Sequence, residues 1–319
     1  MVMENGIAYL NQLTWECRAS RVLHVAVLLK VFTKLADRPL GCKELAAVCG
    51  AKPDILERVL IACCSLGLLK RDGDAYRNTE LSQEYLVDGK PLYQGNIIAH
   101  AARVWDYWHD LPQLILENPQ PPTEARDHRN FVLGMRDITM GGRGQIFLDS
   151  IDLSGRKKLF DVGGGPGLYS ILACQKYPQL TATLFDLPET IAIAREFVQE
   201  AGLTDRISLR GGSWETDDFG SSNDVVLFSN VLHGPTSMAA MKLQKAFDSM
   251  ESGGLLAIQE FALNDDKTGP AMPALFNVMV GAYSKQELIE QITQAGFMNA
   301  EVVTENEQIG CTWITAIKP

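Results

Sequence analysis

The sequence predicts an α/β protein whose C-terminal half holds a mostly parallel β-sheet and whose N-terminal half is mainly helical. From residue 157 onward, apolar strand patterns alternate with amphipathic helix patterns, and the loops between them are short. This alternation is typical of a parallel sheet with helices on both faces. Before residue 157, helical periodicity dominates the sequence. Together these two patterns predict a smaller helical domain followed by a larger α/β domain.

Seven strands are expected in the C-terminal half. The strand patterns lie at 157–163, 181–188, 206–212, 223–233, 253–263, 299–305 and 311–319. Helix patterns lie between most of them, at 167–178, 189–202, 237–250 and 284–296. The last two strands are joined by only a short turn, so we expect them to run antiparallel to each other.

The N-terminal half begins with helical spacing over residues 7–36. A short amphipathic helix follows at 42–50. A second helix starts near Pro53 and ends at Gly67, because proline suits a first helical turn and glycine suits a helix end. Two short strands around an Asp-Gly turn come next, over 68–79. Helix, helix and hairpin in this order form a winged helix-turn-helix pattern.

A winged-helix unit either binds DNA or serves as an interaction module. The second helix offers Lys52 and Arg58 against Asp54 and Glu57, whereas a DNA reader places several basic residues there. The whole chain has a formal net charge of −10, which does not favour binding to a polyanion such as DNA. We therefore interpret the unit as a dimerisation module and expect no nucleic-acid partner.

The bulk composition indicates a globular protein with two domains. The chain has 319 residues, of which 46% are hydrophobic and 21% are charged. Seven cysteines, an odd number, are scattered through apolar segments, which is typical of thiols in a reducing compartment. No Cys/His spacing indicates a metal site. No basic region precedes an apolar run and no stretch suits a bilayer, so we expect a cytoplasmic protein without a membrane partner.

A glycine-rich loop follows the first strand of the C-terminal half. Gly163, Gly165 and Gly167 form G-x-G-x-G. The dinucleotide fingerprint G-x-G-x-x-G is not met, because Leu168 and Ser170 occupy the positions that would need glycine. The loop therefore allows a ligand to approach the backbone closely, without the spacing that a pyrophosphate requires.

Asp186 ends the second strand, on the side of the sheet where ligands bind in such folds. A carboxylate at this point can accept hydrogen bonds from both hydroxyls of a ribose. A glycine loop alone is a weak signal. Strand, loop, helix, strand and terminal acid together predict a site for an adenosine-containing ligand.

These motifs carry a resemblance to a known family. From residue 153 the chain resembles a class I S-adenosylmethionine-dependent methyltransferase domain, whose signature is an acid followed by G-x-G-x-G. With its winged-helix N-terminus, the whole chain resembles the plant caffeic acid and hydroxyindole O-methyltransferases and their bacterial small-molecule relatives. The resemblance implies a Rossmann-like domain with a seven-stranded sheet whose last strand is antiparallel. It also implies S-adenosylmethionine as cofactor and a homodimer formed through the N-terminal domain.

The resemblance implies three regions. Residues 1–100 would form the dimerisation domain, residues 101–152 would be linking helices that contribute to the acceptor pocket, and residues 153–319 would bind the cofactor. Within the linking region we expect a loop at 117–125 and a long helix with a glycine-rich middle over 129–151.

The resemblance also assigns cofactor contacts. Asp161 and the glycine loop match the region around the methionine part, and Asp186 matches the ribose ligand. Gly212 replaces an acid that in the family contacts the adenine amino group, so we expect that contact from the backbone near Ser213 and Trp214. The implied cofactor residues are Asp161, Gly163, Gly164, Gly165, Gly167, Asp186, Leu187, Gly212, Ser213, Trp214, Ser229 and Asn230.

His233 matches the catalytic histidine of the family, at the end of a strand on the ligand side of the sheet. A histidine there can remove the proton of an acceptor hydroxyl during attack on the methyl group. A lone histidine is more often structural, and its placement favours the catalytic interpretation. Glu260 matches the acid that orients this histidine, and the alternative is a carboxylate without a role in catalysis.

The sequence defines the acceptor less well than it defines the cofactor site. The family continues after its histidine with further acids, whereas this chain reads Gly234, Pro235 and Thr236, and a second family glutamate aligns near Ala282. The main interpretation is methylation of a hydroxyl on an aromatic compound, and the alternative is methylation of a thiol or a carbon. A relative that binds the cofactor without methylating and a ligand-sensing regulator stay open. By resemblance the acceptor pocket lies between a helix with Phe131, Met135 and Met140 and a loop with Phe276, Met279 and Tyr283.

Overall fold

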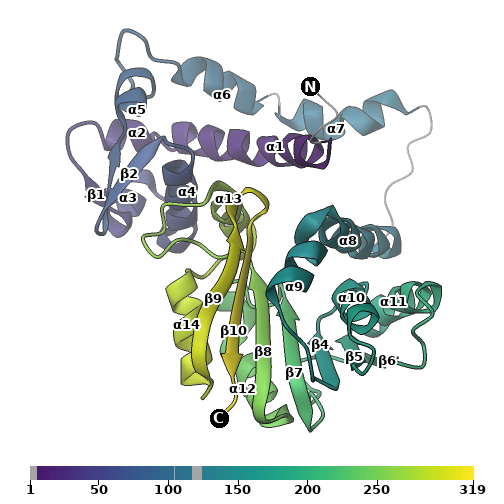
Figure 1. Cartoon of the computed structure of the whole chain (residues 1–319). Helices are drawn as coiled ribbons and strands as arrows, with labels where there is room; N and C mark the ends of the chain where they lie inside the picture. The colour runs from purple at the N-terminus through teal and green to yellow at the C-terminus, as the bar shows by residue number, and fades with distance from the viewer. Residues whose placement is uncertain (1–5, 104, 117–123) are drawn as a thin grey trace. The chain divides into compact units, whose positions relative to one another are not determined.

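The computed structural model describes residues 6–103, 105–116 and 124–319 (Figure 1). The chain divides into two compact units, which we call the helical unit and the sheet unit. The helical unit comprises Met1–Pro121 and Leu263–Ala282, and the sheet unit comprises Pro122–Ala262 and Tyr283–Pro319. Residues 117–123, which hold most of the loop expected at 117–125, lie outside the described residues.

The helical unit contains the expected helices and hairpin, together with elements that the sequence did not indicate. Its elements are α1 (Gly6–Leu28), α2 (Val31–Lys34), β1 (Leu40–Gly41), α3 (Cys42–Cys49), α4 (Pro53–Ser65), β2 (Leu69–Asp72), β3 (Ala75–Asn78), α5 (Glu80–Tyr85), α6 (Gly95–Arg103), α7 (Trp105–Ile115) and α13 (Ala271–Val280). The helix expected over 7–36 breaks at Lys30, which adopts a left-handed conformation with φ of 55°. Strand β1 adds to the hairpin by pairing with β3, so the small sheet has three strands.

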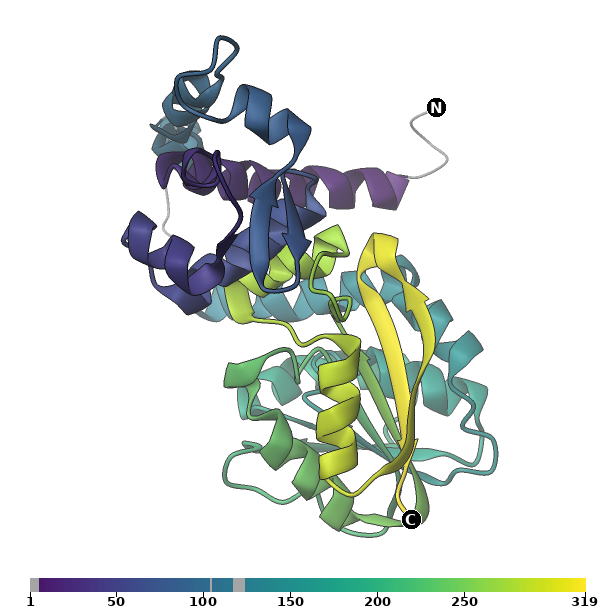
Figure 2. The same cartoon turned by 90° about the vertical axis from the view of Figure 1, so that its left-hand side faces the viewer.

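Helix α13 lies where we expected a loop with Phe276, Met279 and Tyr283. That expectation was wrong for Phe276 and Met279, which are on the helix, while Tyr283 follows it. An apolar run with Pro273 in its first turn suits a helix. The helix packs against α4 (Figure 2), where Ala274 and Ala282 are buried together with Ile61.

Because of this packing, the compact units have other bounds than the functional regions expected at 1–100, 101–152 and 153–319, which stay a prediction. Residues 263–282 leave the sheet after its fifth strand and complete the apolar core of the helical unit, to which Leu275 contributes. Residues 124–152 belong to the sheet unit, since Phe147 is buried in the core of that unit.

The sheet unit is built on a seven-stranded sheet in the described part of the chain, with strand order β6-β5-β4-β7-β8-β10-β9. Its strands are β4 (Lys158–Val162), β5 (Thr181–Asp186), β6 (Ile207–Gly211), β7 (Asn223–Ser229), β8 (Met250–Glu260), β9 (Met298–Asn306) and β10 (Cys311–Ile317). Strands β4 to β8 pair in parallel, whereas β10 is antiparallel to both β8 and β9. The prediction of a mostly parallel sheet with an antiparallel last strand is confirmed.

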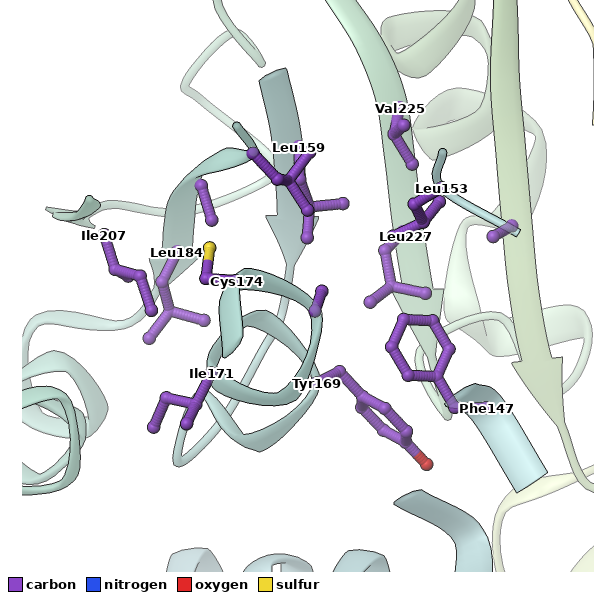
Figure 3. Close-up of a cluster of buried hydrophobic side chains, with 14 of the residues drawn as sticks. Phe147, Leu153, Leu159, Tyr169, Ile171, Cys174, Leu184, Ile207, Val225 and Leu227 are labelled. Carbon is purple, nitrogen blue, oxygen red and sulfur yellow. The ribbon is translucent and has the colours of Figure 1, made fainter. Parts of the chain in front are cut away.

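Helices cover both faces of this sheet (Figure 1). The helices of the sheet unit are α8 (Glu124–Ile138), α9 (Gly144–Ser150), α10 (Leu168–Lys176), α11 (Pro188–Glu200), α12 (Ala239–Ser249) and α14 (Lys285–Gln294). Of these, α8 packs on α11. One core contains side chains of α9, α10 and α11, among them Phe147, Tyr169 and Ile171 (Figure 3). The other contains side chains of α12 and α14. Alternate residues of a strand point to opposite faces, so Leu184 joins the first core and Phe185 the second.

The long helix expected over 129–151 is interrupted in its glycine-rich middle. Helix α8 and helix α9 are joined by a π-helical turn, Thr139–Arg143. Gly142 has φ of 129°, a conformation that side chains disfavour. Such turns often occur at functional sites.

The strand order indicates where a ligand crevice lies in this sheet. From β4 the chain moves outward to β5 and β6 on one side, and β7 and β8 lie on the other. In open α/β sheets, ligands bind beyond the carboxyl ends of the strands at this reversal. The loops after β4, β5, β6 and β7 therefore form the candidate site.

Candidate active site

The glycine loop follows β4 directly. Gly163, Gly165 and Gly167 have φ of 65°, 56° and 82°, which L side chains rarely adopt. At Gly164 an added Cβ would lie 2.1 Å from Cδ1 of Leu184 and 2.7 Å from the carboxyl carbon of Asp161. The loop therefore needs glycine for its backbone turns and for its close packing on the strand ends.

Asp161 lies buried beneath this loop. Its Oδ2 accepts a hydrogen bond of 2.7 Å from the hydroxyl of Ser170 in α10. Its Oδ1 has no partner among the described residues. Burial raises the pKa of Asp161 to about 7, against the hydrogen bond from Ser170, because a low dielectric disfavours the charged form. Asp161 thus links β4 to the first turn of α10 and supports the loop from below.

Asp186 is placed against the same loop. Its Oδ2 accepts the backbone N–H of Gly165 at 2.8 Å, and its Oδ1 accepts the N–H of Leu187 at 2.7 Å. Burial raises the pKa of Asp186, while these hydrogen bonds lower it. The side chain of Leu187 is exposed. The carboxylate is therefore held at the end of β5, one strand away from the glycine loop.

A pocket lies against the glycine loop. It is lined by Met135, Ile138, Thr139, Arg143, Gly163, Gly164, Gly165, Pro166, Leu168, Tyr169, Ser229 and Asn230. Asn230 has a left-handed conformation with φ of 53°, and its buried Oδ1 has no hydrogen-bond partner within the described chain. An unpartnered buried acceptor beside bare backbone suits a ligand that carries a hydrogen-bond donor, as an amino acid portion does. The residues present therefore fit S-adenosylmethionine.

The backbone at the end of β6 makes hydrogen bonds within the protein. The N–H of Ser213, from whose backbone we expected the adenine contact, donates to Oδ2 of Asp217 at 3.0 Å. The N–H of Gly212 donates to the carbonyl of Asp186 at 2.9 Å. A Cβ on Gly212 would lie 2.6 Å from the ring of Phe185, so packing explains why no side chain is present there.

His233 and Glu260 lie side by side at the ends of β7 and β8. His233 Nδ1 and Glu260 Oε2 are 3.3 Å apart, and Glu260 Oε1 accepts the N–H of Leu232 at 2.6 Å. Glu260 is 1% exposed and His233 is 24% exposed. An ionised carboxylate can only accept, so it favours the tautomer with the proton on Nδ1. In this tautomer Nε2 of His233 carries the lone pair that can accept a proton.

Lys242 fixes the segment that leads to His233. Its ammonium group donates to the carbonyl of Val231 at 2.7 Å and lies 3.7 Å from the centre of the Trp214 ring. Burial lowers the pKa of Lys242 to about 8, although the charge of Glu260 acts in the other direction. Trp214, which we assigned to the cofactor, also contacts this lysine.

Arg143 and Gln259 are polar residues of the pocket region that sequence reasoning missed. Arg143 is buried, donates to the carbonyl of Ile309 at 2.6 Å and to Oε1 of Gln259 at 3.5 Å, and packs on the ring of Phe261. Gln259 also accepts the hydroxyl of Ser229 at 3.1 Å. An arginine after two glycines resembles a surface residue in sequence, so only its burial reveals it.

The residues that we assigned to the acceptor pocket do not form one cluster within the sheet unit or within the helical unit. Met135 lines the pocket at the glycine loop, and Tyr283 packs on the core beside α12 and α14. Phe131 and Met140 in the sheet unit are exposed, as is Met279 on α13 in the helical unit.

Two further features bear on the predicted partners. In the described part of the chain, no group of three or more His, Cys, Asp or Glu side chains is arranged to hold a metal ion. None of the described helices combines the length and the apolar character needed to cross a bilayer.

Comparison with known proteins identifies the family. Residues 109–298 match the model of the O-methyltransferase domain, and residues 12–88 match that of the O-methyltransferase dimerisation domain. The chain is 32% identical over 303 residues to 3-hydroxy-5-methyl-1-naphthoate 3-O-methyltransferase of Streptomyces sahachiroi, which covers 89% of this chain and 87% of the relative. It is 28% identical to acetylserotonin O-methyltransferase of Gallus gallus, over 89% of this chain and 90% of the relative.

A solved structure agrees with these relatives. The O-methyltransferase family 2 protein of Planctomyces limnophilus in complex with apigenin superimposes with a TM-score of 0.82 at 26% identity, covering 98% of this chain and 96% of that one. The expected family, fold class and cofactor are confirmed. The chain belongs to the O-methyltransferase family and is a methyltransferase that uses S-adenosylmethionine.

Proposed function

We propose that this enzyme methylates a hydroxyl group on a small, flat aromatic acceptor, with His233 as the base. The observation that carries the proposal is the pair of His233 and buried Glu260 at the ends of β7 and β8, where His233 follows Asn230 of the glycine-loop pocket by three residues. Relatives support the acceptor class: the Streptomyces sahachiroi enzyme is named for a hydroxynaphthoate, and the Planctomyces limnophilus protein was solved with apigenin.

The sheet unit holds the cofactor in this proposal. The glycine loop receives the methionine part, and Asn230 accepts from its ammonium group through the unpartnered Oδ1. Asp186 and Leu187 receive the ribose. Gly212, Ser213 and Trp214, which follow the neighbouring strand β6, contact the cofactor beyond the ribose in this proposal, and Ser229 lines the glycine-loop pocket.

The reaction needs orientation and the removal of one proton. S-adenosylmethionine supplies a methyl group on a sulfonium, which an oxygen attacks in line. A phenol with a pKa of about 10 keeps its proton at neutral pH, so a base has to remove it. Nε2 of His233 takes this proton, while Glu260 holds the ring through Nδ1. The negative charge of Glu260 also stabilises the imidazolium that forms.

The acceptor residues that the sequence suggests are part of the proposal. In the sheet unit, Phe131 and Met140 are exposed apolar side chains and Met135 lines the pocket at the glycine loop, so these three residues suit the flat face of an aromatic ring. Met279 of the helical unit is also an exposed apolar side chain. Phe276 and Tyr283 complete the set. The three regions at 1–100, 101–152 and 153–319 remain our proposal for dimerisation, acceptor and cofactor functions.

A carbon acceptor is the second candidate. After His233 the chain lacks the acids that the family usually has, and L-tyrosine C(3)-methyltransferase of Streptomyces lavendulae is 30% identical over 88% of this chain. Removal of a phenol proton by the same histidine would also activate the ring carbon next to the oxygen. The base is therefore shared by both candidates, and the position of the product methyl group distinguishes them.

The proposal extends to the assembly and its place in the cell. Residues 12–88 match a dimerisation domain, which supports a homodimer formed through this winged-helix region. All seven cysteines are free thiols, which supports a cytoplasmic location.

The test is a screen with cofactor labelled on its methyl group. Phenols, naphthols, thiols and keto acids are offered as acceptors, and the labelled products are separated by class. We expect label on the oxygen of aromatic hydroxyls, and loss of that label in the His233→Ala variant. Label confined to thiols or carbons, or unchanged transfer to phenols by the variant, would overturn the assignment.

A further inference from the structure

Helix α12 carries a buried lysine for whose charge the proposed function gives no role. Lys242 is 2% exposed. Its ammonium group donates to the carbonyl of Val231 at 2.7 Å and lies 3.7 Å from the centre of the Trp214 ring. A lysine is rarely buried to this extent, because an ammonium group is costly to remove from water. A cation retained in this position indicates that the charge itself has a function.

The two groups that Lys242 contacts belong to different loops of the candidate site. Trp214 is in the loop after β6, and Val231 is in the segment between β7 and His233. Both side chains pack on the glycine loop, since a Cβ on Gly163 would lie 2.7 Å from Cγ1 of Val231 and 3.3 Å from Cζ3 of Trp214. One ammonium group thus connects the loops after β6 and β7 at the point where both meet the loop after β4.

A second lysine of α12 binds only one of these loops. The ammonium group of Lys245 donates to the carbonyl of Trp214 at 2.6 Å and to the carbonyl of Asp217 at 2.9 Å. It also donates to the carbonyl of Glu215 at 3.3 Å. These three carbonyls belong to the loop after β6. Lys245 therefore holds the backbone of that loop, whereas Lys242 holds the ring of Trp214 together with the segment that leads to the base.

The charge of Lys242 is present at neutral pH and is lost in mildly alkaline solution. Burial lowers the pKa of Lys242 to about 8, while the charges of Glu260 on β8 and of Glu215 after β6 raise it. Among the described residues, these two carboxylates are the charged groups that act on the lysine. A neutral amine still donates a weaker hydrogen bond to Val231, but it is no longer attracted as a cation to the negative face of the Trp214 ring.

We propose that the charge of Lys242 holds Trp214 and the segment of Val231 against the glycine loop and so stabilises the cofactor site. Lys242 is then a positioning residue, because it acts on cofactor binding through these two loops and makes no contact with the cofactor itself. This inference rests on the proposed cofactor site at the glycine loop and Trp214. Neither the acceptor nor proton removal by His233 enters into it.

The test compares the wild type with Lys242→Met, which keeps an unbranched apolar side chain and removes the charge. Calorimetry measures the dissociation constant Kd of S-adenosylhomocysteine for both proteins at pH values on both sides of 8. At neutral pH we expect the Kd of the variant to be about three- to tenfold higher, because the cation no longer holds the ring. Above pH 8 the ratio of the two values should fall towards one, since the wild type then loses the same charge. A ratio that is the same at every pH, or a ratio of one at neutral pH, would overturn the proposal.

Lys242→Arg tests whether the charge is sufficient. A guanidinium keeps its proton throughout this pH range and also stacks on aromatic rings. We expect this variant to bind S-adenosylhomocysteine about as well as the wild type at neutral pH. Its advantage over Lys242→Met should persist above pH 8, where that of the wild type disappears. A folded arginine variant that binds as weakly as the methionine variant would contradict the inference. Urea unfolding establishes that each variant is folded, and the comparison of wild type with Lys242→Met stands without the arginine variant.

The neighbouring lysine serves as the matched control. Lys245→Met makes the same change one helical turn away but leaves the contacts of Lys242 in place. This variant should therefore keep the wild-type loss of affinity above pH 8, and absence of that loss would assign the effect to the loop instead of Lys242. The readout is binding without turnover, so failure of phenol methylation would overturn the proposed function and leave these ratios intact. If Asp186→Ala weakens binding while Lys242→Met does not, the cofactor site stands and this inference alone fails.

Discussion

Two regions at the strand ends of the sheet unit serve different functions and use different side chains. At the ends of β5 and β6, carboxylates accept backbone N–H groups: Asp186 accepts from Gly165 and Leu187, and Asp217 accepts from Ser213. At the ends of β7 and β8, the carboxylate of Glu260 accepts the N–H of Leu232 and also lies against the His233 side chain. The first region presents fixed acceptors, and the second presents a base in one tautomer.

The difference indicates how each region responds to substitution. Backbone donors are supplied by the fold, so the first region depends on glycine conformations and on each carboxylate for binding. The second region depends on one proton position, so a change there should affect turnover before it affects binding. Substitutions on the two sides should therefore separate cofactor affinity from kcat.

The largest effect is expected at His233. The His233→Ala variant should lower kcat with a phenolic acceptor by about 10²–10⁴, the usual contribution of general base catalysis. Its affinity for S-adenosylhomocysteine should stay at the wild-type value, because the histidine serves the acceptor. Steady-state kinetics and calorimetry measure the two quantities. A parallel loss of both would mean that the two regions do not divide their tasks.

Glu260→Gln tests the same region, the ends of β7 and β8. Glutamine can still accept the N–H of Leu232, but it can also donate to His233 Nδ1 and so favour the wrong tautomer. We expect kcat to fall by less than in His233→Ala, with unchanged cofactor affinity and a shifted pH profile of kcat. A wild-type pH profile would assign Glu260 to the structure alone.

Asp186→Ala tests the other region, at the end of β5. Loss of a charged acceptor for the ribose should weaken cofactor binding by roughly 10–100-fold. At saturating cofactor, kcat should fall much less, since the base at His233 is intact. Calorimetry with S-adenosylhomocysteine, followed by kinetics at high cofactor concentration, gives the split. Tight binding by the variant would place the ribose elsewhere.

Two neighbouring glycines separate packing from backbone conformation. In Gly164→Ala the new Cβ would meet Leu184 and the Asp161 carboxyl, at a cost of about 1–3 kcal/mol. In Gly165→Ala nothing lies within 4 Å, so the cost comes from the φ of 56° alone, about 1 kcal/mol. Urea unfolding of both variants measures the difference. Equal stability of the two would argue against the close packing at Gly164.

The most gradual effect concerns Asp161 and pH. Its pKa in the folded protein is raised to about 7, above the ordinary value of 3.8, so the folded state holds this proton more tightly than the unfolded state. The contribution of Asp161 to the free energy of unfolding is therefore fully present below pH 3.8. It is lost as the pH rises from 3.8 to about 7, by up to about 1.4 kcal/mol per pH unit. Asp161→Asn lacks this dependence. Urea unfolding of both proteins from pH 4 to pH 8 should show the difference, and parallel curves would contradict it.

Much of the sheet unit was predictable from sequence because its elements follow local patterns. Apolar runs of strand length, the glycine loop and the acid at 186 depend on residues close together in the chain. The parallel order followed from alternation, since parallel strands need helical crossovers. Helix α13 was missed because its partner surface on α4 is far away in sequence.

The sequence by itself determined the strand and helix pattern, the family, and which residue types stand at the strand ends. The tertiary structure alone decided which side chains meet there. It brought Glu260 to His233 across 27 residues, buried Arg143 against Ile309, and packed the ring of Phe185 against Gly212. The physical reason is that element type depends on local backbone preference and periodicity, whereas these contacts depend on how distant elements pack.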